Sequence, residues 1–373
     1  MFVTLLILIF ARPFISSLAF PYANLTYSIL LLGVLALWII TKGAHLDQIK
    51  LIRYPVALFI LALLISLIFS QDKIMSVKEL YKYITGILLI VAVVSLTHKE
   101  RNRIILCMVV SGLLISLLAI YQYFFGFQRI LNYILRQGIS DPFVLDYISR
   151  KRVFFPFVTP NILAGYLAMI IPLALAHKNR TWFIIPLSFA LLLTKSLGGL
   201  LSLFFGLGIY FYLQGNFGKK RAIFLSGLLI TTILVLILRS VTPKQHIQPI
   251  FSTLMRLSYW KDTLKIIGSA PLTGVGIGNF NLFQSRYAHN SYLQIWAEMG
   301  VLGIISFLWL IIRTIKSGLW NIKNAPNKNQ IASLIAANTV FLVHNFVDFT
   351  FFLPEVNLIW WIILGLIISQ GKE

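Results

Sequence analysis

The chain has 373 residues, of which 58% are hydrophobic and 12% are charged, and its mean hydropathy is +0.86. A soluble domain of this composition would leave large apolar patches in water, which excludes a soluble protein. The formal net charge of +21 is spread over loops without a compact basic domain, so we expect no nucleic acid as a partner. We therefore predict an all-α, polytopic integral membrane protein that forms a single transmembrane domain over residues 1–373.

Apolar runs near the length of about 20 residues that one bilayer crossing requires predict about twelve transmembrane helices. The first run lacks a basic leading region and is followed at once by further runs, so we interpret it as a helix rather than a cleaved signal. The division of residues 181–213 into two spans depends on Lys195-Ser196 alone, because no other charged residue interrupts this apolar stretch. The predicted spans are residues 2–20, 25–41, 55–70, 80–96, 103–125, 160–177, 181–194, 197–213, 222–240, 291–313, 331–347 and 354–370.

Lysines and arginines in the short loops predict the orientation, because cytoplasmic loops carry an excess of these residues. With twelve spans and a cytoplasmic N-terminus, one whole set falls on the cytoplasmic side, and both termini are then cytoplasmic. Many other basic residues gather in two longer loops on the outer face, at 126–153 and 241–290. The cytoplasmic set is Lys42, Lys50, Arg53, Lys99, Arg101, Arg103, Lys178, Arg180, Lys219, Lys220, Arg221, Arg313, Lys316, Lys323, Lys328 and Lys372.

The first outer loop, Gly126–Val153, contains a segment with the pattern of an interfacial amphipathic helix. The segment is Gln128–Arg136, and it carries Arg129 and Arg136 near one face. Two interpretations remain open for this loop. It contacts membrane lipid headgroups, or it guides an anionic, lipid-linked substrate toward the site.

The second outer loop, Val241–Asn290, is about 50 residues long, and ordered loops of this length are usually functional. Helical periodicity over 251–267 places Arg256, Trp260, Leu264 and Ile267 on one stripe. Arginine suits bidentate capture of a phosphate, so Arg256 is a candidate ligand for an anionic substrate. The alternative is a structural ion pair, for instance with Asp262 or Glu355.

Glycines alternate along the segment Pro271-Leu-Thr-Gly274-Val-Gly276-Ile-Gly278. The spacing resembles a dinucleotide-binding fingerprint, but no strand and no βαβ unit accompany it, so we reject that interpretation. Glycines at alternate positions allow the backbone to pass close to another element or to a substrate. A turn that binds no ligand is the simplest interpretation.

His289 and Asn290 close the second loop where the next span begins. A histidine at a helix start on the membrane surface is suited to proton transfer near neutral pH, or it is an interfacial polar anchor. No second histidine or carboxylate stands at metal-ligand spacing, so we expect no metal. Glu298 is an acid inside a span and therefore a functional candidate, although its place on the opposite helix face favours packing or pairing.

Three blocks of sequence resemble the O-antigen ligase and O-antigen polymerase superfamily. The first two are Arg256-Leu-Ser-Tyr-Trp260 and Ala270-Pro-Leu-Thr-Gly-Val-Gly-Ile-Gly-Asn-Phe280. The third begins at His289-Asn-Ser-Tyr-Leu-Gln-Ile-Trp-Ala-Glu and ends at Gly303. Thr159-Pro-Asn-Ile-Leu-Ala-Gly-Tyr-Leu167 and His344-Asn-Phe-Val-Asp348 support the resemblance, which covers roughly residues 150–370.

The resemblance implies an all-helical glycosyltransferase of the GT-C kind in a bacterial inner membrane, with its active site facing the periplasm. It implies a glycan on undecaprenyl diphosphate as donor, a hydroxyl of a glycan or lipid as acceptor, and neither metal nor other cofactor. Arg256 matches the family arginine that holds the diphosphate, and His289 matches the family histidine taken as the base. We add Lys195, Arg286, Arg152, Trp260 and Asn290 as candidate substrate-binding residues.

One position departs from the family pattern. The family commonly has Ser-Arg-Gly after the seventh span, whereas this chain has Ser196-Leu197-Gly198. Lys195 is one helical step away and offers an ammonium in place of the guanidinium fork, which is not an equivalent ligand for phosphate. Arg152 or Arg286 are the candidates that could compensate.

The resemblance leaves several functions open. A ligase moves a finished polymer, a polymerase joins repeat units, and a third variant glycosylates protein. Outside this class, the composition also allows a transporter of an anionic lipid or small anion, or a non-catalytic assembly subunit. Transporters place ionisable residues near the membrane midplane, often within inverted repeats, whereas the polar residues here gather at one face, which favours the enzyme.

Overall fold

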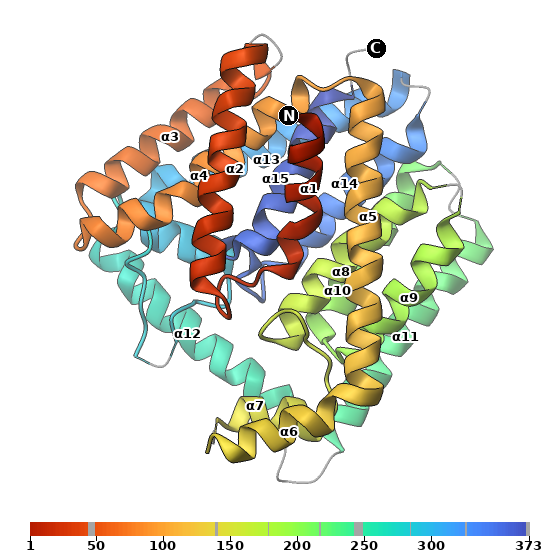
Figure 1. Cartoon of the computed structure of the whole chain (residues 1–373). Coiled ribbons are helices and arrows are strands. Elements are labelled where there is room, and N and C mark those ends of the chain that lie inside the picture. The colour runs from red at the N-terminus through yellow and green to blue at the C-terminus, as the bar shows by residue number, and fades with distance from the viewer. Residues whose placement is uncertain are drawn as a thin grey trace.

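The computed structural model describes residues 1–43, 49–138, 141–177, 179–215, 218–241, 249–283, 285–324 and 327–370. Within these ranges every regular element is a helix, which confirms the all-α prediction (Figure 1). Each predicted span contains a helix. These helices are α1 (Phe2–Ala11), α2 (Pro21–Lys42), α3 (Arg53–Ile68), α4 (Lys73–Val94), α5 (His98–Tyr121), α8 (Pro160–Leu175), α9 (Arg180–Leu193), α10 (Leu197–Leu213), α11 (Lys219–Ser240), α13 (Ser291–Asn324), α14 (Lys328–His344) and α15 (Pro354–Ser369).

Four stretches among the described residues are long and apolar enough to cross a membrane by length and composition: Pro21–Lys42, His98–Arg136, Lys219–Ser240 and Ser291–Ile322. Six shorter apolar helices accompany them, so several apolar helices are present and the count of twelve spans stays a prediction. The predicted first span was too long, because α1 ends at Ala11 and a short 3-10 helix, Arg12–Phe14, follows it. Pro13 in that segment has no N–H to continue the helix.

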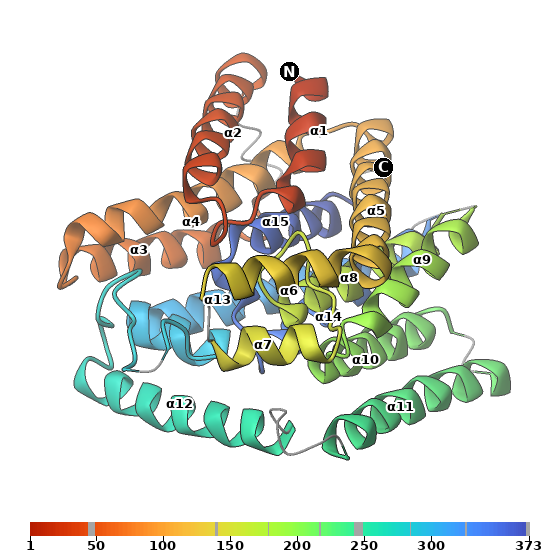
Figure 2. The ribbon, with the colours of Figure 1, turned by 60° about the horizontal axis from the view of Figure 1, so that its bottom comes forward.

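The core of the bundle is built by α8, α14 and α15. Every residue of α15, nearly every residue of α8 and most residues of α14 are buried, and Trp360 and Trp361 on α15 are completely inaccessible. The helices α4, α10 and α13 pack around this centre. By contrast, α11 exposes most of its apolar side chains, and Figure 2 shows it with α12 (Pro249–Ser269) along one side of the molecule. An apolar surface of this kind suits a helix that faces lipid.

Contacts between distant segments show which helix connections lie together at the same end of the bundle. At one end, Gln330 donates to Asn102 at 2.8 Å, the Arg313 guanidinium donates to the Leu51 carbonyl at 3.2 Å, and Arg101 bonds to the Ser369 carbonyl. These connections were all assigned to the cytoplasmic side, so their predicted grouping is confirmed. Which end faces the cytoplasm remains a prediction. Lys178 and Lys372 and the side chain of Lys323 lie outside the described residues.

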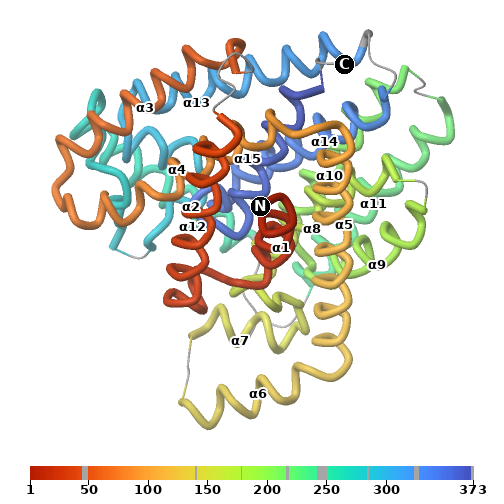
Figure 3. The backbone as a smooth tube through the Cα atoms, turned by 45° about the horizontal axis from the view of Figure 1, so that its top comes forward, coloured from red at the N-terminus to blue at the C-terminus, as the bar shows by residue number. Residues whose placement is uncertain are grey.

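The opposite end carries the outer loops. Figure 3 shows α6 (Phe127–Arg136) and α7 (Pro142–Ser149) projecting from the body of the bundle. The helix predicted at Gln128–Arg136 is therefore confirmed as α6, and its place at the membrane interface remains a prediction. In the second loop, α12 begins at Pro249, while residues 242–248 and 284 lie outside the described residues. Asn279 of this loop accepts a hydrogen bond from the Asp72 amide at 3.0 Å, which ties it to the start of α4.

Candidate functional site

Arg256 lies on α12 and has no carboxylate partner among the described residues. Its Nη1 donates to the Ser252 hydroxyl at 3.3 Å, and its buried Nε has no hydrogen-bond partner there. Asp262 pairs with Lys265 at 2.8 Å and Glu355 pairs with Arg12 at 3.3 Å, so the structural ion pairs considered for Arg256 are wrong. The guanidinium remains available for an anionic ligand.

The predicted stripe on α12 is only partly buried. Ile267 is 5% exposed and Trp260 is half-buried, whereas Leu264 is 53% exposed. The indole of Trp260 donates to the His289 carbonyl at 3.4 Å. Trp260 therefore holds the backbone of the candidate base against α12, and this contact explains its place beside the site.

His289 lies between two aromatic rings. Its imidazole stacks on Tyr259 of α12 with ring centroids 5.6 Å apart and meets the edge of Phe349 at 4.8 Å. Burial and the positive charge of Arg256 lower the pKa of His289 to about 4, although Asp348 opposes this shift. The imidazole is therefore neutral at ordinary pH and can accept a proton.

Four basic side chains gather within electrostatic reach of Arg256, where α7 and the following loop meet the turn between α9 and α10. We call Arg150, Arg152, Lys195 and Arg239 the basic cluster. Lys195 donates to the Arg150 carbonyl at 2.6 Å, and Arg239 donates to the Lys195 carbonyl at 3.3 Å. Asp146 pairs with Arg150 at 2.9 Å. The cluster thus brings together four cations beside this carboxylate, an arrangement that favours an anionic ligand.

Arg152 occupies the centre of this cluster and is 3% exposed. It donates to the Thr194 carbonyl at 3.0 Å and to the Asn161 side chain at 3.1 Å. Burial and the charge of Arg239 lower the pKa of Arg152 to about 9. Burial and the charge of Arg152 likewise lower the pKa of Lys195. A bound anion would relieve the repulsion that both groups experience.

Tyr147 links the basic cluster to Arg256 and Asp348. The Arg152 guanidinium lies over its ring at 5.1 Å. Burial raises the pKa of the Tyr147 phenol, while Arg152 and Arg256 oppose this shift and Asp348 adds to it. The phenol therefore lies within electrostatic reach of both candidate arginines and of Asp348.

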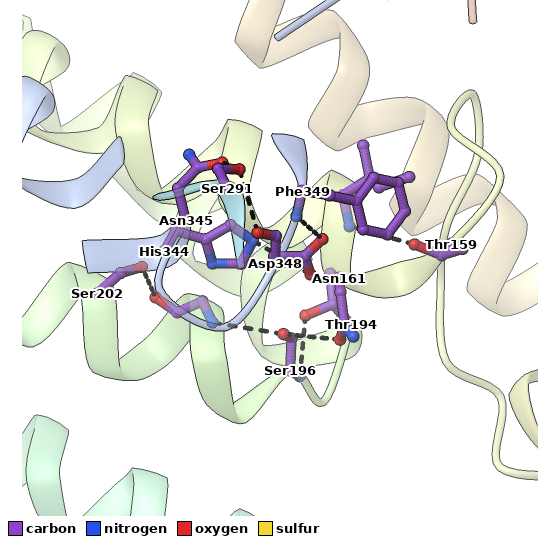
Figure 4. Close-up of polar contacts among 12 residues, drawn as sticks. Thr159, Asn161, Thr194, Ser196, Ser202, Ser291, His344, Asn345, Asp348 and Phe349 are labelled. Carbon is purple, nitrogen blue, oxygen red and sulfur yellow. Dashed lines mark hydrogen bonds and ion pairs between the residues drawn. The ribbon is translucent and has the colours of Figure 1, made fainter. Parts of the chain in front are cut away.

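A hydrogen-bonded group joins the starts of three helices beside this site (Figure 4). Ser196 at the start of α10 donates to Asn161 of α8 at 3.0 Å, and Ser291 at the start of α13 donates to Asn345 at 2.6 Å. Asp348 lies 3.6 Å from His344 and accepts a hydrogen bond from the Phe349 amide at 2.8 Å. Helix N-termini favour negative charge, so their convergence adds to the attraction for an anion.

The other residues predicted to bind substrate, Asn290 and Arg286, lie in different surroundings. The Asn290 side chain accepts from the Tyr292 and Leu293 amides at 3.0 and 3.1 Å, so its oxygen caps α13. Arg286 was a candidate to compensate for Leu197, but it lies 3.6 Å from Glu79 in a different pocket. Of the two residues that could compensate for Leu197, only Arg152 therefore lies at the basic cluster.

The glycine segment packs against a break in α13. Gly300 has φ +65° and interrupts the helix. The Val275 and Gly276 amides donate to the Ala297 and Glu298 carbonyls at 2.9 and 3.1 Å, which satisfies groups released by the break. A Cβ at Gly274 would collide with the Glu298 backbone. The expected close approach to another element is confirmed, and that element is α13.

Several residues of the site had no role assigned from sequence. Asp348 and His344 belong to a quoted motif, but their contact with each other was not expected. Arg239 ends α11, and its reach to the Lys195 carbonyl depends on the packing of α10 against α11. The described residues contain no group of three histidine, cysteine, aspartate or glutamate side chains that could hold a metal. That the protein needs no metal remains a prediction.

The comparison with known families adds an independent finding. Residues 182–308 match the model of a family described as O-antigen ligase. This part of the chain is similar to the O-antigen ligase family. No curated protein matches the chain. The O-antigen ligase match runs from α9 into α13 and includes Lys195, Arg256 and His289. The family indicates a glycosyl-transferring membrane enzyme of cell-surface polysaccharide biosynthesis.

Proposed function

We propose that the protein transfers a glycan from undecaprenyl diphosphate to an acceptor hydroxyl at the site between Arg256 and His289. The observation that carries the proposal is the placement of a neutral imidazole within electrostatic reach of an arginine that has no acidic partner among the described residues. The match to the O-antigen ligase family supports a glycan as the transferred group.

The chemistry follows from these two groups. His289 accepts the proton of the acceptor hydroxyl while the hydroxyl oxygen attacks the anomeric carbon of the donor glycan. The bond between that carbon and the diphosphate oxygen breaks, and the leaving diphosphate carries the new negative charge. Arg256, together with Arg152 and Lys195 of the basic cluster, stabilises this charge. The proton then passes from the imidazole to solvent.

The proposed setting is a bacterial inner membrane, with the site on its periplasmic face and both termini in the cytoplasm. The donor reaches the site from the bilayer, because its lipid stays in the hydrocarbon region while its diphosphate lies at the interface. The apolar surface of α11 leads to Arg239 at its outer end and offers a path for such a lipid. The architecture proposed for this reaction is GT-C-like.

The test is transfer by the purified protein in lipid, supplied with a short glycan on undecaprenyl diphosphate. Three acceptors are compared: lipid A–core, a second lipid-linked repeat unit and a peptide. Transfer to lipid A–core identifies a ligase, transfer to the second repeat unit identifies a polymerase, and transfer to peptide identifies a protein-glycosylating relative. Absence of transfer to all three, with the donor bound, would contradict the proposed function and favour a transporter or an assembly subunit.

A further inference from the structure

The exposed face of α12 takes no part in the proposed reaction. The inner face of this helix packs against the bundle through the buried residues Thr263 and Ile267. It also holds Tyr259 and Trp260 against His289. On the opposite face, exposed side chains return every three or four residues, which is the spacing of one helical stripe. We call this set the outer stripe: Ile250, Leu254, Leu257, Lys261 and Leu264.

The outer stripe is mostly apolar and lies on the surface of the part of the chain that the structure describes. Its three leucines and Ile250 are each between 50% and 67% exposed. Four large aliphatic side chains in one row form a continuous apolar patch of a kind that soluble surfaces rarely expose. Contact with water is unfavourable for such a patch, so a different surrounding must cover it.

The charges of α12 exclude a position across the centre of a bilayer. The helix has 21 residues, which is enough to cross by length. It is not among the four described stretches that are also apolar enough to cross. Charged side chains at the bilayer centre are costly, and those of α12 lie in its middle. They are Arg256, Lys261, Asp262 and Lys265.

Continuity with α11 indicates that lipid covers the outer stripe. The helix α11 precedes α12 in the chain and contacts it, and both lie along one side of the molecule (Figure 2). Leu234, Ile237 and Leu238 of α11 are also at least half exposed. Because α11 has the length and composition of a bilayer crossing, lipid surrounds these side chains. The same lipid then extends to the adjoining face of α12.

The cations on this face indicate which part of the lipid α12 contacts. Lys261 is exposed within the outer stripe, and the side chain of Lys265 is 69% exposed next to it. Asp262 pairs with Lys265 at 2.8 Å. Lysine side chains lay their stems along apolar surface and extend the ammonium to the membrane interface, where lipid phosphates lie. The outer stripe therefore matches the boundary between acyl chains and headgroups.

We infer that α12 seats its outer stripe in the phospholipid leaflet at the end of the bundle that carries His289. Acyl chains replace water around the leucines, and Arg256 stays on the opposite face of the helix, toward the site. Because an α-helix with its side chains is about 10–12 Å across, Arg256 lies about one helix diameter from this lipid. A lipid-linked diphosphate then reaches the guanidinium without leaving the leaflet. This last consequence rests on the proposed function, whereas the contact with lipid does not.

The test measures the surroundings of single nitroxide spin labels on the full chain, in vesicles of phosphatidylethanolamine and phosphatidylglycerol. The native Cys107 is replaced by serine, and each label is attached to one introduced cysteine. Collisions with oxygen, which dissolves in lipid, are compared with collisions with a charged, water-soluble metal chelate. Leu234→Cys on α11 is the lipid reference, and Lys99→Cys at the other end is the water reference. The test variants are Leu254→Cys, Leu257→Cys and Leu264→Cys.

The ratio of oxygen to chelate collisions decides the inference. In the three test variants it should exceed the Lys99→Cys ratio by about threefold or more, because acyl chains exclude a charged chelate. Ratios equal to that of Lys99→Cys would place α12 in water. Few collisions with either reagent would mean that protein covers the stripe, as in a second copy of this chain. Either result would overturn the inference. The labels report without any glycan transfer, so failure of the proposed reaction would leave a lipid contact standing.

Discussion

The hydrogen-bond partners of the Arg256 guanidinium favour a role in binding over a role in a structural ion pair. A buried arginine in a structural pair would have a carboxylate within hydrogen-bond distance, whereas Arg256 bonds to the Ser252 hydroxyl at 3.3 Å. Its fork can therefore receive two oxygens of a diphosphate. Lysine keeps the charge but cannot reproduce two parallel hydrogen bonds.

Replacement Arg256→Lys should lower kcat/KM for the donor by about 10-fold to 100-fold, because one charge-assisted hydrogen bond contributes about 1.5–3 kcal/mol. The measurement is steady-state transfer in lipid at matched protein amounts. Arg103→Lys, at an exposed position of the opposite end, is the control and should leave kcat/KM unchanged. Wild-type kcat/KM in Arg256→Lys would contradict bidentate binding.

The pH dependence of transfer should report the environment of His289. A base is lost as pH falls through its pKa, and burial together with Arg256 lowers the pKa of His289 to about 4. We therefore expect kcat/KM to stay level down to about pH 5 and to fall about tenfold per unit below about pH 4. Arg256→Gln should move this midpoint upward, because the repulsion is removed. A wild-type midpoint near the ordinary histidine value of about 6.5 would contradict the assignment.

Sequence patterns located some residues of the site and missed others for a physical reason. Arg256 and His289 stand in motifs whose chemistry points to an anion and a base. Arg239 reaches the site through packing between elements that are distant in sequence, and no local pattern encodes this packing. Asn290 stands directly before α13 and caps it, and this cap position is visible in the sequence, while its role in substrate binding stays a prediction.

At the scale of elements, the contact between the glycine segment and the broken helix α13 positions His289. The half-helix that begins at Ser291 ends at Gly300, where the glycine segment bonds to the Ala297 and Glu298 carbonyls. His289 directly precedes this half-helix. Displacement of the glycine segment would therefore shift the candidate base.

Gly274→Ala should destabilise the protein strongly and reduce transfer. Gly274 has φ +73°, and an added Cβ would meet the Glu298 backbone. The matched control is Gly215→Ala, since Gly215 has φ +66° but nothing within 4 Å of its Cβ position. Gly215→Ala should lower the free energy of unfolding by only about 1–2 kcal/mol, the strain of a residue with a Cβ in the left-handed backbone conformation. Thermal unfolding in lipid measures both, and equal losses in the two variants would contradict the packing role of Gly274.

The elements themselves were predictable to different degrees. Hydrophobic runs located helices at all twelve predicted spans, because apolar length is a local property. α7 was missed, although Asp141 and Pro142 form a helix start in which the Asp141 side chain accepts from the Phe143 and Val144 amides at 2.8 and 3.0 Å. The break in α13 at Gly300 was also missed, because it is stabilised by a distant segment.

At the scale of the whole molecule, the two sets of helix connections define opposite ends of the bundle. The orientation in the membrane was predicted from basic residues in short loops. The buried pair of Arg12 with Glu355, at 3.3 Å, joins the first helices to the last and belongs to the end that carries His289. Its neighbour Ser17 bonds to the same carboxylate at 3.0 Å.

Cysteine labelling tests this orientation. The native Cys107 is replaced by serine, and single cysteines are placed at Phe283, which is fully exposed, and at Lys99, which is exposed at the other end. A membrane-impermeant maleimide added to intact spheroplasts should label Phe283→Cys and not Lys99→Cys. Permeabilised cells should label both. The reverse pattern would contradict a periplasmic site.

The most direct measurement of the proposed reaction compares wild type with His289→Ala in the transfer assay, with donor binding measured on the same samples. Loss of the base should lower kcat by about 10²–10⁴ while the donor is still bound through Arg256 and the basic cluster. That result would place proton transfer at His289 in an intact donor site. Transfer by His289→Ala at the wild-type rate would contradict the proposed mechanism.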